Sequence, residues 1–181
     1  DCTACDDFTT EITTSGTAFQ AQVAQCIGRW NKYCPEDVPI GCWDTSEVTD
    51  MSNAFSGQAS FDDSIYCWNT ARVNRRDGMF DGASNFNQPI NDWDVASVTS
   101  MKKMFNKAST FNQPLDDLDV TNVVDMGNMF YQATNFNQRI NDWDVANVDT
   151  MGGMFYKANN FNQPLDDWNP ASVSSFASMF N

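Results

Sequence analysis

The sequence contains no histidine, and only 10 Lys and Arg residues oppose 24 Asp and Glu residues. The missing histidine removes the commonest general base and metal ligand of proteins. The formal net charge of −14 argues against nucleic-acid binding, because phosphate backbones attract Lys and Arg. No apolar run approaches the roughly 18 residues of a membrane-spanning helix. The chain begins at Asp1 without a visible signal peptide, which fits a processed mature chain or an incomplete sequence.

Glutamate is scarce, with 3 residues against 21 aspartates. Aspartate favours turns over helix interiors, so the composition argues against long helices. A nucleophile motif and a glycine-rich phosphate loop are also missing. The many carboxylates occur in repeated, equivalent positions, whereas a catalytic acid and base need different environments. We therefore expect a noncatalytic protein.

Cysteine is confined to the first 67 residues. An even number clustered at one end predicts disulfides and an oxidising compartment, either secreted or cell-surface or an organelle lumen. Zinc is disfavoured because histidine and paired CxxC motifs are lacking, and no cofactor is expected. The six cysteines are Cys2, Cys5, Cys26, Cys34, Cys42 and Cys67.

A 25-residue repeat fills the rest of the chain, with six copies over residues 36–181. Residues at the same place in successive copies are called a column here. The tryptophan column is Trp43, Trp68, Trp93, Leu118, Trp143 and Trp168. One phenylalanine column is Phe55, Phe80, Phe105, Phe130, Phe155 and Phe180, and a second is Phe61, Phe86, Phe111, Phe136 and Phe161. All nine methionines fall in two further columns.

Each copy reads as a short strand, a short helix and a loop. The apolar-x-x-apolar-x-apolar spacing of Ile90, Trp93 and Val95 is that of the leucine-rich-repeat strand. Met101, Met104 and Phe105 then lie at helical spacing behind a column rich in N-cap residues. One copy cannot bury its apolar face alone, so copies must stack. The asparagine column of the Phe-Asn-Gln-Pro segment is expected to bond loop backbone between copies.

These features predict an α/β solenoid, a leucine-rich-repeat-like right-handed stack of six coils. Residues 1–35 would form a Cys-rich tail and a cap helix, and residues 36–181 the solenoid. The cap helix is predicted over residues 17–32, where four residues at helical spacing would cover the first coil. They are Phe19, Val23, Cys26 and Trp30.

The repeat W-D-V-x-x-V-x-x-M-x-x-M-F-x-x-A-x-x-F-N-Q resembles the BspA-type repeat, a leucine-rich-repeat variant of bacterial surface lipoproteins and secreted algal proteins. The resemblance covers about residues 38–181. It implies a noncatalytic, extracellular or surface-exposed protein for adhesion and protein interaction, without fixed binding residues. Departures include Leu118 for Trp, Arg76 in a methionine column, and Pro170.

The disulfide framework follows in part from stacking. Cys42 and Cys67 lie 25 residues apart, which makes them neighbours in adjacent coils and predicts a disulfide between them. Cys26 and Cys34 would then pair with Cys2 and Cys5, which ties the tail to the cap helix. The pairing among these four stays open.

Aspartates flank the tryptophan column on both sides. Because side chains alternate along a strand, they should line one open sheet face. Their mutual repulsion calls for salt screening of a solvated face, a basic protein partner, or Ca²⁺. We call this surface the acidic face; its residues are Asp44, Asp92, Asp94, Asp117, Asp119, Asp142, Asp144 and Asp167.

Other features suggest partners. Arg72, Arg75 and Arg76 form a basic cluster at helical spacing, either for an anion or partner, or paired with nearby aspartates. The last copy ends without a visible cap, and we expect a partner or further chain over it.

Two functions are weighed. The first is a protein-interaction or adhesion module, and the second is an accessory subunit of a larger assembly, such as a lumenal subunit of an algal photosynthetic complex. Carbohydrate binding ranks third, because it requires exposed aromatic rings and the tryptophan column is expected to be buried.

Overall fold

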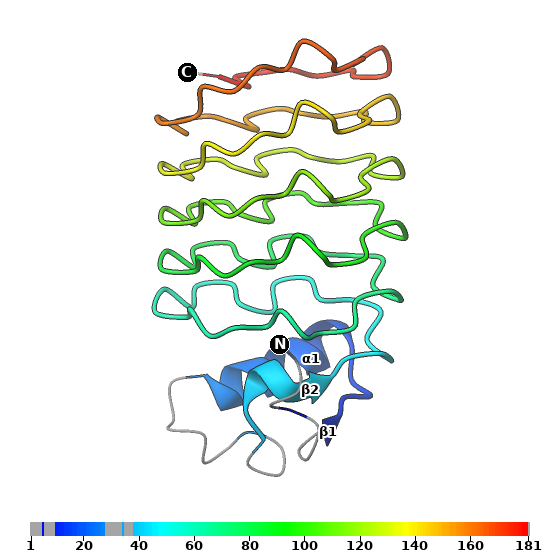
Figure 1. Cartoon of the computed structure of the whole chain (residues 1–181), viewed down its shortest axis with the longest axis vertical. Coiled ribbons are helices and arrows are strands. Elements are labelled where there is room, and N and C mark those ends of the chain that lie inside the picture. The colour runs from blue at the N-terminus through cyan, green and yellow to red at the C-terminus, as the bar shows by residue number, and fades with distance from the viewer. Residues whose placement is uncertain (1–4, 6–9, 28–33, 35–37, 181) are drawn as a thin grey trace.

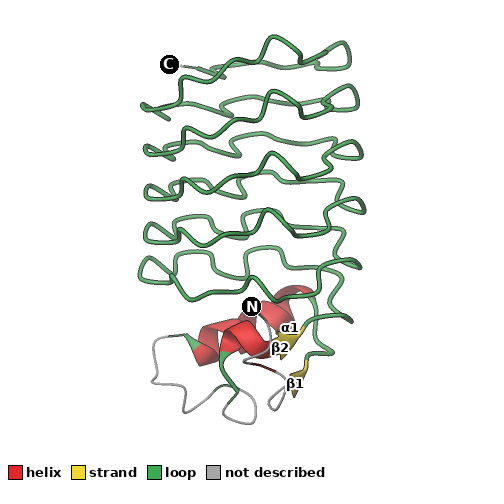
Figure 2. Ribbon diagram, in the orientation of Figure 1, coloured by secondary structure: helices red, strands yellow, loops and turns green. Residues whose placement is uncertain are grey.

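The chain forms layers stacked along the longest axis of the molecule (Figure 1). The computed structural model describes residue 5, residues 10–27, residue 34 and residues 38–180. Figure 2 shows helix and strand only at the N-terminal end, and the layers above consist of loops and turns. The expected domain boundary between residues 35 and 36 lies outside the described residues.

Helix α1 (Gly16–Cys26) covers the first layers, as the spacing of its apolar residues predicted. Phe19, Val23 and Cys26 are buried. The ring of Phe19 lies 6.3 Å from that of Trp43 and 5.6 Å from that of Trp68, in edge-to-face contacts. The helix is shorter than predicted, because the backbone is already extended at residue 27. Trp30 lies outside the described residues.

The segment before α1 pairs with the first copy. Strand β1 (Thr10–Glu11) runs parallel to β2 (Trp43–Asp44), which follows the 3₁₀ turn η3 (Ile40–Cys42). The Ser15 hydroxyl accepts hydrogen bonds from the backbone N–H groups of residues 49 and 50, at 2.8 and 3.0 Å. The N-terminal segment thus adds a parallel strand, which the sequence analysis missed.

The strand predicted at the tryptophan exists only in the first copy, as β2. In the later copies of the described chain, the residue after the tryptophan closes a turn: the Asp94 carboxylate accepts the backbone N–H of Ala96 at 3.0 Å. Parallel pairing is reduced to single bridges between residues 25 apart. They are Asp50 with Arg75, Arg75 with Ser100, Ser100 with Asp125, Asp125 with Thr150, and Thr150 with Ser175.

The helix predicted in each copy is replaced by consecutive turns. The N–H of Gln58 donates to the carbonyl of Phe55 at 3.1 Å, and Gly57 between them has φ 74°, which an α-helix cannot contain. The N–H groups of Phe55 and Gly57 donate to Met79 and Asp81 of the next copy, at 2.8 and 2.7 Å. A helix would keep these donors within its own coil, so the helix prediction is wrong.

The apolar columns form one continuous core. In each phenylalanine column the rings stack nearly parallel: Phe80, Phe105 and Phe130 follow one another with centroids 5.5 Å apart. The indole N–H of Trp143 donates to the carbonyl of Leu115 in the preceding coil at 2.9 Å. Burial of matching side chains in successive layers supplies the apolar area that stabilises the stack.

The asparagine column connects loop backbone from coil to coil, as predicted. The side-chain oxygens of Asn87, Asn112 and Asn137 each accept the backbone N–H of the asparagine one copy later, all at 2.9 Å. Asp62 does the same for Asn87, at 2.8 Å.

The described cysteines are disulfide-bonded as predicted, but the predicted pairs are wrong, both Cys42 with Cys67 and Cys26 and Cys34 with Cys2 and Cys5. Cys42 is bonded to Cys5, not to Cys67, because the pairing of β1 with β2 brings the N-terminal segment beside the first copy. Cys26 is bonded to Cys34, which links the end of α1 to the chain eight residues later. Cys67 is also disulfide-bonded. Cys2 lies outside the described residues.

Candidate functional site

The acidic face lies on the surface, on both sides of the buried tryptophan column. Asp44 is half-buried, and the other seven carboxylates are exposed. Trp93 and Trp143 between them are 4% and 2% exposed, and Leu118 is 4% exposed. The tryptophan column therefore faces the core and the two aspartate columns face solvent. Most of these aspartates lie in turns rather than in strands.

The column that follows the tryptophan consists of turn-forming carboxylates. Asp119 accepts the backbone N–H of Thr121 at 3.1 Å, and Asp144 accepts that of Ala146 at 3.0 Å. Hydrogen bonds from the side chain and backbone of Thr121 lower the pKa of Asp119. Asn69 takes the same role in the second copy, with Ala71 as donor. The first five side chains of this column, from Asp44 to Asp144, are thus fixed by their own backbone.

The column that precedes the tryptophan is held by side chains of neighbouring coils and, at Asp142, by an arginine of the same coil. The amide of Asn91 donates to Asp117 at 2.5 Å, and the amide of Asn141 donates to Asp167. Arg139 forms an ion pair with Asp142 at 2.9 Å. These contacts pair the carboxylates with hydrogen-bond donors of the chain itself, which offsets part of their mutual repulsion.

Asp92 in this column contacts Tyr66 of the preceding copy. The hydrogen bond to Asp92, together with its negative charge, raises the pKa of the Tyr66 hydroxyl.

A hollow of about 340 Å³ opens on the acidic face at the fifth and sixth copies. Its lining includes Asp142, Asp144, Asp167 and Asn169. Within the described ranges, no group of three or more His, Cys, Asp or Glu side chains is arranged to hold a metal ion. The geometry offers several separate hydrogen-bond acceptors, which suits a partner with multiple donors.

The three arginines of the predicted basic cluster do not share a surface. Arg72 is exposed and pairs with Glu47 at 2.6 Å, and Arg75 is exposed and pairs with Asp77 at 2.8 Å. Arg76 is fully buried in its methionine column. The prediction of a basic cluster is wrong because these residues lie in turns. Side chains at i, i+3 and i+4 share one face only in a helix.

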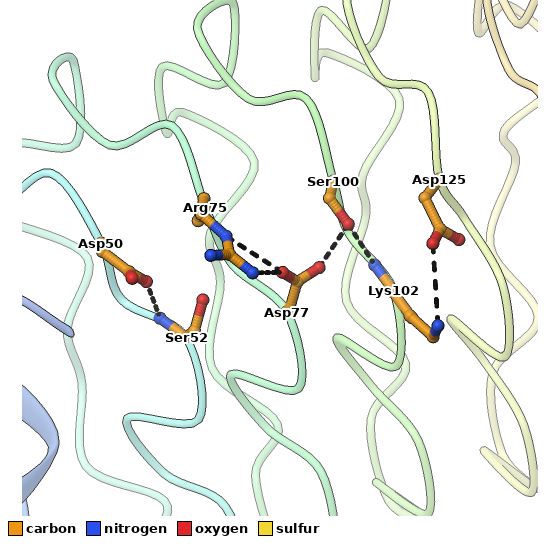
Figure 3. A network of polar contacts seen from close by, with 7 residues as sticks. All are labelled: Asp50, Ser52, Arg75, Asp77, Ser100, Lys102 and Asp125. Carbon is orange, nitrogen blue, oxygen red and sulfur yellow. Dashed lines mark hydrogen bonds and ion pairs between the residues drawn. The ribbon is translucent and has the colours of Figure 1, made fainter. Parts of the chain in front are cut away.

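The alternative that the arginines pair with nearby aspartates is confirmed for Arg75 and Asp77. The sequence analysis missed the larger polar network to which this pair belongs, which runs along the bridged residues Arg75, Ser100 and Asp125 (Figure 3). Asp77 accepts hydrogen bonds from Arg75 and from the hydroxyl of Ser100 in the next coil. Further along, Lys102 reaches Asp125 at 3.9 Å. The 25-residue period alone could have indicated this network, because it places these side chains in adjacent columns.

The family match covers all six copies and most of the chain. Residues 22–134 and 114–181 match the model of the family described as Mycoplasma protein of unknown function, DUF285. The chain belongs to the DUF285 family. Membership supports the resemblance to BspA-type surface proteins in coarse form, and the disulfides of this DUF285 chain fit an extracellular or surface location.

Comparison with curated proteins and with solved structures finds no match. In the described part of the DUF285 chain, no helix is long and apolar enough to cross a membrane.

Proposed function

We propose that this DUF285 protein is a noncatalytic interaction and adhesion module of the cell surface or an oxidising lumen. We further propose that the stack is a leucine-rich-repeat-like, right-handed solenoid of six coils, with turns in place of helices. The acidic face is the contact surface for a basic protein partner.

The observation that carries this proposal is the fixed arrangement of exposed carboxylates. Asp119 and Asp144 are held by backbone donors and Asp117 by Asn91, so little side-chain freedom is lost when a partner binds. The net charge of −14 would attract a basic partner over distance, and the attraction would weaken with salt. A carboxylate array of this kind suits Lys and Arg side chains.

The proposal is tested by a native pulldown of the endogenous protein at low and high salt, with mass spectrometry of the retained proteins. We expect basic proteins to be retained at low salt and released at high salt. Retention that is indifferent to salt would contradict an acidic contact surface. Retention of a fixed set of proteins at constant ratio under both conditions would favour the accessory-subunit alternative.

A further inference from the structure

A second hollow, of about 440 Å³, lies on the turns of the fourth to sixth copies. None of the eight aspartates of the acidic face lines it. Its size falls within the roughly 300–1,000 Å³ of small-molecule sites. We call it the tyrosine groove; its floor and walls include Gly127, Gly152, Tyr131, Tyr156, Lys102 and Asp125.

The floor of the groove arises from a change in one column. The first three copies carry Ser52, Asp77 and Lys102 there, and the next three carry Gly127, Gly152 and Ala177. In Figure 3, Asp77 and Lys102 project into the polar network between coils, and Lys102 extends toward Asp125. Where glycine replaces these side chains, the network stops and the surface becomes hollow.

One wall of the groove is aromatic. Tyr131 and Tyr156 stack with ring centroids 4.7 Å apart and planes inclined by 13°. Both rings are half-buried, so each keeps surface toward solvent. The earlier copies have Ser56, Asp81 and Asn106 in this column. The tyrosines and the glycines thus replace small or charged residues in the same copies, and together they form the groove.

The polar lining carries no net charge. Among the described residues that line it, Lys102 and Asp125 are the only charged side chains, and they lie 3.9 Å apart as an ion pair. Next to the lining, the Lys157 ammonium lies 5.3 Å from the ring centroid of Tyr156. Asn128, Thr150 and the tyrosine hydroxyls add uncharged donors and acceptors. An anionic ligand would have to displace Asp125 from Lys102. The lining therefore suits a neutral ligand with many hydroxyl groups and some apolar C–H surface.

We propose that the tyrosine groove binds a neutral saccharide, as a short stretch of an oligosaccharide. Sugar rings combine hydroxyl groups, which match the amide, hydroxyl and carboxylate groups of the lining, with C–H faces, which match tyrosine. Within the groove the small floor residues recur over three coils, as Gly127, Gly152 and Ala177, and the tyrosine wall recurs over two. A ligand built of repeating units fits such a site. This inference is independent of the proposed partner of the acidic face.

The test is isothermal titration of the whole protein with three neutral hexasaccharides, namely a β-1,3-glucan, a β-1,4-glucan and an α-mannan. Gly152→Lys fills the floor with the residue that the third copy already carries as Lys102. A Cβ at this position would meet its nearest atom at 3.5 Å, an ordinary contact. The double variant Tyr131→Asn and Tyr156→Asn replaces both wall tyrosines by asparagine, the residue that the third copy carries in this column as Asn106. The control is the triple variant Asp94→Asn, Asp119→Asn and Asp144→Asn, which alters only the acidic face.

We expect wild type and the control to bind at least one hexasaccharide, and Gly152→Lys and the double tyrosine variant to bind at least roughly ten-fold more weakly, or ~1.4 kcal/mol. Thermal melting of each variant establishes that it is folded. Absence of binding by wild type to all three probes would overturn the proposal. So would full binding by folded Gly152→Lys, because the groove would then not be the site.

Discussion

The side-chain oxygen of Asn112 accepts the backbone N–H of Asn137, one coil away, at 2.9 Å, and it also accepts the side-chain amide of Gln138 at 3.0 Å. One exposed side chain thus satisfies two donors of the following copy. The stack is therefore held at its loop edge by a polar column, in addition to the apolar columns of the core.

Replacing Asn112 by Ala should lower the free energy of unfolding by about 1 kcal/mol, because the N–H of Asn137 loses its acceptor. Chemical denaturation measures this change. Asn112→Asp is the matched control, since Asp62 performs the same role for Asn87 at 2.8 Å. Equal destabilisation by both variants would show that the side-chain oxygen at residue 112 does not stabilise the fold as an acceptor.

Arg76→Met should stabilise the protein. Arg76 is fully buried, and among the described atoms its Nε and Nη1 have no hydrogen-bond partner. Its Nη2 donates to the carbonyl of Asp94 at 2.8 Å, and its guanidinium lies 5.1 Å from the Trp93 ring centroid. Methionine restores the repeat and removes a buried charge, which should raise the free energy of unfolding by about 1–4 kcal/mol.

Thermal and urea unfolding check this effect against Arg72→Met, which changes an exposed arginine and should have an effect of about 0–1 kcal/mol. A net loss of stability in Arg76→Met larger than in Arg72→Met would contradict this account of the buried cation.

The advantage of Arg76→Met should shrink at alkaline pH. Burial lowers the pKa of Arg76 to about 9 in the folded state, well below the ordinary value of arginine. Above pH 9 the unfolded chain therefore binds more protons at this group than the folded chain, so wild-type stability rises with pH there. The difference in unfolding free energy between variant and wild type, measured at pH 7 and pH 10, should fall. A constant difference would mean that the group does not titrate.

Asp92→Asn should lower the pKa of Tyr66 toward its ordinary value of 10.0, because the hydrogen bond and negative charge of Asp92 raise it. Ultraviolet absorbance of tyrosinate, compared with Tyr66→Phe to assign the signal, follows this titration. Asp142→Asn, which removes a carboxylate of the same column paired with Arg139, should leave it unchanged. An unchanged Tyr66 titration in Asp92→Asn would show that the two side chains are not in contact.

Gly153→Ala should be more destabilising than Gly57→Ala. Both glycines have positive φ, 65° and 74°, so alanine is strained by about 1 kcal/mol at either. A Cβ at Gly153 would also lie 2.4 Å from the side-chain oxygen of Asn128, whereas nothing lies within 4 Å at Gly57. Denaturation midpoints measure the difference in stability between the two variants. Equal losses of stability would show that the Asn128 side chain does not lie against residue 153.

The sequence predicted the columns but not the local backbone. Burial of Phe105, Trp143 and their equivalents in the first five copies, and the asparagine contacts, follow from the period alone. The backbone prediction failed because Met and Phe at helical spacing also fit consecutive turns, and the left-handed positions are occupied by residues as different as Gly57, Lys107 and Gln132. The choice between these backbones depends on hydrogen bonds to the next coil, which one copy does not contain.

The candidate site, like the fold, was predicted only in part: the exposure of its aspartates was predicted, and their contacts were not. The exposure of the aspartate columns follows from their alternation with a buried tryptophan. Their compensation by Asn91 and Asn141 was not foreseen, because those contacts depend on how far one coil is displaced over the next. The pair of Arg139 with Asp142, within one coil, was also missed. The Cys5–Cys42 disulfide was missed because the two-residue strand β1 has almost no sequence signal.

The most direct test of the proposed function is a quantitative pulldown that compares wild type with the triple variant Asp94→Asn, Asp119→Asn and Asp144→Asn. Asn69 already forms the same turn in the second copy, so these changes remove charge and keep the backbone. The control removes three exposed carboxylates elsewhere, in Glu11→Gln, Asp63→Asn and Asp149→Asn. We predict that the triple variant loses the basic proteins that wild type and the control retain at low salt. Equal retention by all three proteins would contradict the acidic face as the contact surface.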